Sequence, residues 1–301
     1  MSTILSTLIG VHAAMVELVA GMLLFAALVI TPGRTARPEE SAVLRRGLAL
    51  GFLLVGTLAM IGWLWLVAAV MAGLRTLPSP PIVFATLSTT RFGWIWAGRA
   101  LVASFAISAL IRDRAGPTRR DAALVWSLLL LASLALTTRA AEPSAPRYAL
   151  AAAETVHLLA TAAWAGALVP LAALALRLRG ADPSPWREAA RAMARRCRRY
   201  FAAAGVGLVA TGAAMAWTLA GGPGAPHMDS PYGRILAAEA GLGLAMLTLG
   251  TAGRLVLWPR LLAGRPRAFG MVATATAIEG LLALAAIAAG AVMASTPLAV
   301  G

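Results

Sequence analysis

The chain has 301 residues, 60% of them hydrophobic, and a mean hydropathy of +0.80, well above the composition of an ordinary soluble domain. Its net charge is +14, because 26 basic residues, all of them arginine, outnumber 12 acidic residues. Most of the arginines lie between apolar segments, so we expect a lipid bilayer and no nucleic acid as partner. Its single cysteine, Cys197, excludes an intramolecular disulfide and a CxxC metal motif.

Eight apolar segments are long enough to cross the hydrocarbon core, which takes about 20 helical residues. We place them at 4–30, 45–72, 92–111, 122–138, 149–176, 199–219, 232–257 and 269–295. With their short connections they use the whole chain, which leaves no room for a soluble catalytic domain, and no P-loop is present. The sequence therefore predicts an all-α, polytopic transmembrane helical bundle that is not an enzyme.

Arginine clusters mark alternate connections between these segments. They follow the first, third, fifth and seventh segments, and arginine is enriched in cytoplasmic loops. We therefore expect a bacterial cytoplasmic (inner) membrane, with both termini outside, in the periplasm. The longest of these connections, 177–199, is predicted to form a short basic amphipathic helix on the inner membrane surface, facing anionic lipid.

The chain contains an internal repeat in which the order of the matching residues is kept. In the first helix of each half, a histidine is followed nine residues later by a glycine, as in His12 with Gly21 and His157 with Gly166. Further matches in the second and third helices are Gly51 with Gly205, Thr57 with Thr211, Trp63 with Trp217, and Gly93 with Gly233. Because four helices return the chain to its starting side, we predict two parallel four-helix repeats, 1–145 and 146–301.

His12 and His157 are the leading candidates for function, because ionisable side chains inside a membrane are costly to keep. Each lies about 12 Å inside the outer end of its predicted helix, at 1.5 Å of rise per residue. Packed near the repeat axis, the two imidazoles could face each other and bind a metal ion or a haem iron. The alternative is that each histidine bonds a backbone carbonyl or a carboxylate for packing.

Three further residues are candidate metal ligands. Glu154 lies on the helical face of His157 and could orient that ring or bind metal itself, or simply meet water at the helix mouth. Met15 lies on the face of His12, and imidazole with thioether favours copper, particularly Cu(I), unless the methionine only packs. His227, in an outer loop, could capture an external metal ion or belong to a solvated loop.

Four other charged residues, Glu17, Arg99, Glu239 and Glu279, also lie within predicted helices. Arg99 and Glu239 occupy matching positions of the repeat. They are interpreted either as a buried ion pair between the halves or as part of a polar path.

Several motifs of the second half match those of a known family. Glu154, His157, Trp164 and Gly166 fit a helix of the form acidic-x-x-His…Trp-x-Gly. The run 230–236 fits the pattern Gly/Ser-x-Tyr-Gly-Arg-x-Leu, and Glu279 together with 295–297 fits a last helix. On these motifs the chain resembles the CopD (copper resistance protein D) family of polytopic membrane proteins.

This resemblance implies a role in copper transport or copper homeostasis, often with a periplasmic copper-binding partner of the CopC type. Members often carry Gly-His-Ala at the end of the fourth helix, where this chain has Thr138-Arg139-Ala140. Arginine cannot bind a metal cation, which leaves His12 with His157 as the best remaining pair. Copper is therefore expected near the periplasmic face, with His12, His157, Glu154, Met15 and His227 as its candidate ligands.

Two alternatives to copper transport stay open at this point. The chain could be a membrane redox or electron-transfer protein that binds haem b, with His12 and His157 as axial ligands. It could also be an assembly factor for a metalloenzyme, with no transport of its own.

Overall fold

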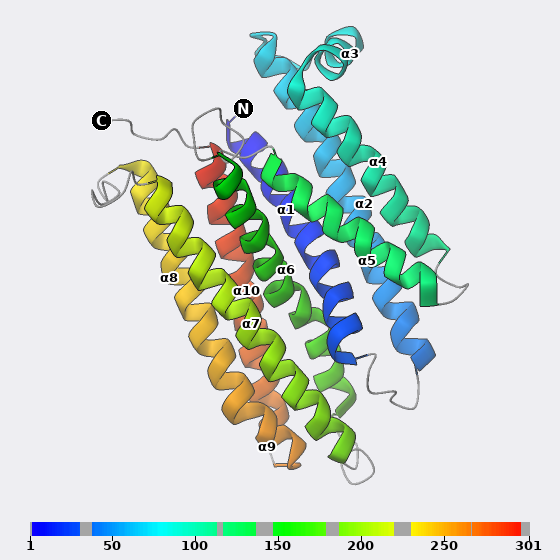
Figure 1. Ribbon diagram of the computed structural model, residues 1–301, viewed down its shortest axis with the longest axis vertical. Coiled ribbons are helices and arrows are strands. Elements are labelled where there is room, and N and C mark those ends of the chain that lie inside the picture. Colours follow the sequence, from blue (N-terminus) through cyan, green and yellow to red (C-terminus); the bar gives the residue numbers. More distant parts are fainter. Residues whose placement is uncertain are drawn as a thin grey trace.

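The structure is a computed structural model that describes residues 2–30, 38–112, 117–136, 147–178, 187–219, 230–265 and 267–295. Within these ranges the chain is helical and contains no β-strand (Figure 1). Among the described residues, seven helices are long and apolar enough to cross a membrane, and Asp121–Leu136 adds a shorter apolar helix. The predicted all-α transmembrane bundle is therefore confirmed.

The first half of the chain contains α1 (Ser2–Phe25) with its π-helical continuation η1 (Ala26–Ile30), α2 (Pro38–Met71), α3 (Pro80–Thr89), α4 (Arg91–Ile111), and α5 (Pro117–Ala132) with the 3₁₀ turn η3 (Ser133–Leu136). The short helix α3 was not predicted. It begins at a proline, which is favoured at the first helical position. Thr90 then caps α4, where its hydroxyl accepts a hydrogen bond from the Gly93 amide at 2.9 Å.

The second half contains α6 (Arg147–Leu178), α7 (Arg187–Leu219), α8 (Pro231–Ala252), the π-helical segment η6 (Gly253–Leu257), α9 (Trp258–Leu262) and α10 (Ala268–Ser295). Ser230 caps α8 as Thr90 caps α4, with its hydroxyl accepting from the Gly233 amide at 3.0 Å. The predicted surface helix before α7 is wrong, because α7 runs unbroken from Arg187. No glycine or proline interrupts its alanine- and arginine-rich first turns, so nothing ends the helix there.

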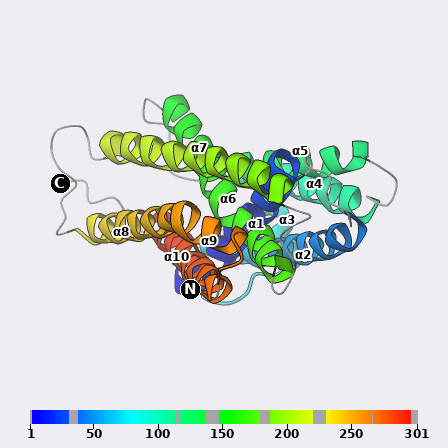
Figure 2. The ribbon, with the colours of Figure 1, turned by 90° about the horizontal axis from the view of Figure 1, so that it is seen from below.

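Helices α1 and α6 pack against each other in the middle of the bundle (Figure 2). A Cβ atom on Gly21 would collide with the Ala162 carbonyl, and one on Gly166 would collide with the Gly21 backbone. Small residues of this kind let membrane helices approach closely. Helices α2, α4 and α5 lie on one side of this central pair, and α7, α8 and α10 lie on the other.

Helix α1 begins and α10 ends at the same end of the bundle, while α9 and the start of α7 lie at the opposite end (Figure 1). We call these the outer end and the inner end, after the orientation that the arginine pattern predicts. The division into repeats 1–145 and 146–301 and the side of the membrane that each end faces stay predictions.

Candidate functional site

His12 is buried between α1 and α2, with 1% of its surface exposed. Its Nδ1 lies 2.9 Å from the carbonyl oxygen of Gly56 on α2. A carbonyl only accepts hydrogen bonds, so Nδ1 carries the proton and Nε2 carries the lone pair of the neutral ring. Within the described ranges, Nε2 is buried without a hydrogen-bond partner, which leaves that lone pair open to another ligand.

Met15 lies beside His12 on the same face of α1. Its Cβ would be 3.0 Å from a Cβ atom added to Gly56, so the glycine admits both side chains against α2. Met22, about two turns further along this face, is buried in an apolar cluster with Val19 and Leu53 and serves as packing.

A fixed cation lies close to His12. The guanidinium of Arg99 on α4 lies 5.3 Å from the ring centre of Trp63, whose ring centre is 6.2 Å from that of His12. Arg99 donates to the hydroxyl of Ser133 at 3.0 Å and to its carbonyl at 2.7 Å. Its charge acts on His12, so any cation bound at this histidine meets repulsion from Arg99.

His157 repeats the arrangement of His12 in the second half. Its Nδ1 lies 3.0 Å from the hydroxyl of Thr211 on α7, and that hydroxyl donates to the Gly207 carbonyl at 2.5 Å. The hydroxyl proton is thereby used, so Thr211 accepts from Nδ1, and the backbone of Leu208 on α7 also bonds this histidine. Gly212 packs beside the ring, where an added Cβ atom would be at ordinary contact distance from Cε1, 3.4 Å.

The structure does not bring the two histidines together. Nine residues are two and a half helical turns, so His12 lies on the face of α1 opposite Gly21, and His157 lies opposite Gly166 on α6. The two glycines form the contact between α1 and α6, and each imidazole is directed to the second helix of its own half. The expectation of facing imidazoles is therefore wrong, and the haem alternative is not supported.

The remaining predicted ligands do not complete a metal cluster. Glu154 lies one turn before His157 on α6 and is half-buried. His227 and Arg139 lie outside the described residues. In the part of the chain that the structure describes, no three or more His, Cys, Asp or Glu side chains are grouped as a metal site.

Arg99 and Glu239 also lie apart. Arg99 belongs to α4 and Glu239 to α8, and these helices lie on opposite sides of α1 and α6 (Figure 2). Glu239 is instead near Glu17 of α1, close enough for their charges to interact, and it contacts the position of Gly290 on α10. Glu17 is 3% exposed, and the Oε2 atoms of both carboxyl groups are buried without a hydrogen-bond partner among the described residues.

A buried ion pair in the second half was missed by sequence reasoning, although one of its residues, Glu279, was noticed as a motif position. Arg254 Nη1 lies 2.9 Å from Glu279 Oε1, which also accepts a hydrogen bond from the Trp164 indole at 2.5 Å. The Arg254 guanidinium lies 3.3 Å from the ring centre of Phe201. A Cβ atom on Gly250 would collide with this group, so the glycine makes room where α6, α7, η6 and α10 meet.

Comparison with known families gives two matches. Residues 1–146 match the model described as Copper resistance protein D-like, N-terminal domain. Residues 191–293 match the model described as Copper resistance protein D. No curated protein and no solved structure matches the chain.

Proposed function

The chain belongs to the CopD (copper resistance protein D) family of membrane proteins, and from this premise we propose that it moves copper across the cytoplasmic membrane. It is a multi-pass membrane protein, with seven helices that suit a bilayer. In this proposal it is a transport protein and not an enzyme. Its arginine-rich inner end lies in the cytoplasm and both termini lie in the periplasm.

In this proposal, His12 is the copper ligand of the first half and Met15 is its companion. The observation that carries the proposal is the fixed orientation of His12, with Nδ1 held by Gly56 and Nε2 buried without a partner. A hydrogen bond to one ring nitrogen orients the other for a metal ion. Imidazole with thioether favours Cu(I), and the single charge of Cu(I) is also repelled less by Arg99 than the double charge of Cu(II).

His157, with Glu154 one turn before it, is the corresponding copper contact of the second half. Its ring is held at Nδ1 by Thr211, as the ring of His12 is held by Gly56. Because the two imidazoles point away from each other, we propose one contact in each half instead of a shared site.

The test is a Cu(I) titration of the purified chain in lipid nanodiscs, under reducing conditions and against a competing chelator. His12→Ala and His157→Ala should each lose about half of the bound copper, and the double variant nearly all of it. Met15→Leu should weaken the first contact, while Met22→Leu, which alters only packing, should not. Full copper content in both histidine variants, or a haem absorption band in the purified protein, would overturn the proposal.

We further propose that a periplasmic copper-binding protein of the CopC type delivers copper at the outer end. Family membership and the depth of His12, two to three turns from the start of α1, support this proposal. Transfer from a copper-loaded CopC-type protein to the chain in nanodiscs should be faster than dissociation of copper from the donor alone. Equal rates would show that no delivery contact forms.

A further inference from the structure

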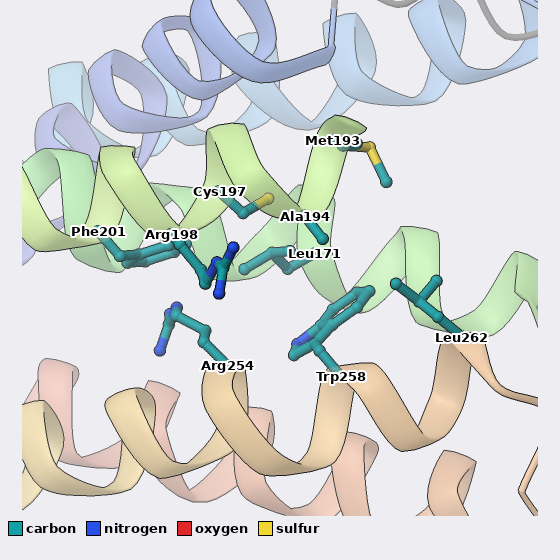
Figure 3. A pocket seen from close by; sticks show the side chains of 9 residues that line it. All are labelled: Leu171, Met193, Ala194, Cys197, Arg198, Phe201, Arg254, Trp258 and Leu262. Carbon is teal, nitrogen blue, oxygen red and sulfur yellow. The ribbon is translucent and has the colours of Figure 1, made fainter. Parts of the chain in front are cut away.

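A pocket lies near the inner end of the bundle, between α7 and the η6–α9 segment (Figure 3). Its wall is largely apolar and includes Leu171, Trp258 and Leu262. The charged residues that line it are Arg198 of α7 and Arg254 of η6. Figure 3 shows both side chains reaching into the space between α7 and η6.

Arg254 keeps unused hydrogen-bond donors in this pocket. Its side chain is 8% exposed, and only Nη1 reaches Glu279. Its Nε and Nη2 are buried without a hydrogen-bond partner in the described part of the chain, and one face of the group lies on Phe201. Buried donors without an acceptor destabilise a fold, so an acceptor is expected at this position.

The second arginine that lines the pocket adds a further positive charge, so we expect the acceptor to be an anion. Arg198 is an exposed residue of α7 whose side chain lines the same pocket as Arg254. Glu279 balances only one of these two positive charges, so the largely apolar pocket keeps an excess positive charge that a bound anion would balance. A phosphate group has several acceptor oxygens and matches the forked donors of two guanidinium groups.

We propose that this pocket binds the phosphate of an anionic phospholipid, with an acyl chain along the wall formed by Leu171 and Leu262. The apolar wall favours a lipid over a free phosphate ion, since a small ion gains nothing from apolar surface. Basic pockets between membrane helices at the cytoplasmic side hold anionic headgroups. Trp258, at the start of α9, supplies the aromatic ring that is typical of the membrane interface.

The test is native mass spectrometry of the full chain in detergent, titrated with phosphatidylglycerol, with phosphatidylcholine as the neutral lipid. Arg198→Gln should weaken phosphatidylglycerol binding by about tenfold, since it removes a charged hydrogen-bond donor. Arg199→Gln is the matched control, because Arg199 is the next residue of α7, is also exposed and does not line the pocket. It should bind phosphatidylglycerol like the wild-type chain.

Arg254→Lys tests the buried side of the pocket. It keeps a positive charge beside Glu279 but removes the Nε and Nη2 donors, so phosphatidylglycerol binding should again fall by about tenfold. Equal binding by Arg198→Gln and Arg199→Gln would overturn the proposal, since the attraction would then be a diffuse property of the basic surface. Thermal protection by inorganic phosphate equal to that by phosphatidylglycerol would assign the pocket to a free anion instead. Copper binding by Arg198→Gln should be unchanged, which separates this proposal from that of copper transport.

Discussion

At the scale of single residues, a side-chain hydroxyl bonds His157 in addition to the backbone of Leu208, whereas His12 bonds the backbone of Gly56. His12 donates to the backbone carbonyl of Gly56, which no side-chain substitution removes. His157 donates to the hydroxyl of Thr211, which a substitution can remove without touching the histidine. Thr57, which matches Thr211 in the repeat, donates only to the Leu53 carbonyl of its own helix, at 2.7 Å. Comparing the same substitution at Thr57 and at Thr211 therefore distinguishes an effect on ring orientation from a general effect on packing.

Thr211→Val should lower copper affinity in the second half by about 10–100-fold, because valine keeps the shape of threonine but cannot accept from the imidazole. Thr57→Val should leave copper affinity unchanged, since His12 does not depend on that hydroxyl. Cu(I) titration of both variants in nanodiscs measures the difference. If the two variants lose copper to the same extent, or neither does, His157 is not oriented for copper by Thr211.

At the scale of helices, the contact between α1 and α6 depends on the absence of side chains at Gly21 and Gly166. A Cβ atom at Gly21 would meet backbone, which cannot move aside as a flexible side chain can. Gly51 of α2 is an exposed helical glycine whose added Cβ would meet nothing within 4 Å. The same substitution therefore has opposite consequences at the two positions.

Gly21→Ala should lower the free energy of unfolding by about 1–3 kcal/mol, as expected for overpacking at a close helix contact. Gly51→Ala should leave it unchanged or raise it by up to about 1 kcal/mol, because alanine is the better helix former. Thermal unfolding of both variants in the same detergent gives the comparison. Equal stability of the two variants would mean that α1 and α6 do not meet at Gly21.

The positions of the helices along the chain could be predicted, because the length of an apolar run sets what can cross a bilayer. The helix α3 could not, since its ten residues are too few to cross a bilayer and begin with two prolines. The early start of α7 could not, since its first turns are rich in arginine and hydropathy says little about them. For the site, the repeat singled out His12 and His157 as candidates but could not give their orientation. Matching positions in the repeat predict that the two histidines lie at equal depth in the bundle. The direction in which each side chain points depends on which face of its helix packs against the other half, and here that is the face of Gly21 and Gly166.

Contacts between distant helices are the part of the site that the sequence could not supply. Arg99 and Glu239 occupy matching repeat positions, yet Arg99 bonds Ser133 in the first half and Glu239 approaches Glu17. The pair of Arg254 with Glu279 likewise joins η6 to α10, which no local pattern relates. Such pairs follow only from how the helices are arranged in the bundle.

At the scale of the whole molecule, arginines at the inner end also hold helices together. Arg46 of α2 donates to the carbonyl of Ile111 at the end of α4, at 3.2 Å. Arg196 of α7 donates to the carbonyl of Val29 in η1, at 3.0 Å. The last carbonyls of a helix lack partners within the helix, and basic side chains satisfy them. The arginines that predict the orientation of the bundle thus also stabilise its inner end.

The orientation itself can be tested with a single added cysteine, because Cys197 is buried and gives a low background. Ser79 lies at the outer end, before α3, and is exposed, and its side chain makes no cap hydrogen bond that a cysteine would remove. Arg265 lies at the inner end, between α9 and α10, and is also exposed. Ser79→Cys should therefore react with a membrane-impermeant maleimide on spheroplasts, whereas Arg265→Cys should react only after the membrane is opened.

The reverse labelling pattern would place the arginine-rich end in the periplasm, where positive loops are disfavoured. It would also move His12 and His157 to the cytoplasmic half of the bilayer. Copper that crosses from the periplasm to the cytoplasm would then reach these histidines at the end of its path instead of at the start. The expected pattern places both histidines near the periplasmic face and the pocket of Arg198 and Arg254 in the inner leaflet. A single pair of labelling reactions thus decides on which side of the membrane each proposed site acts.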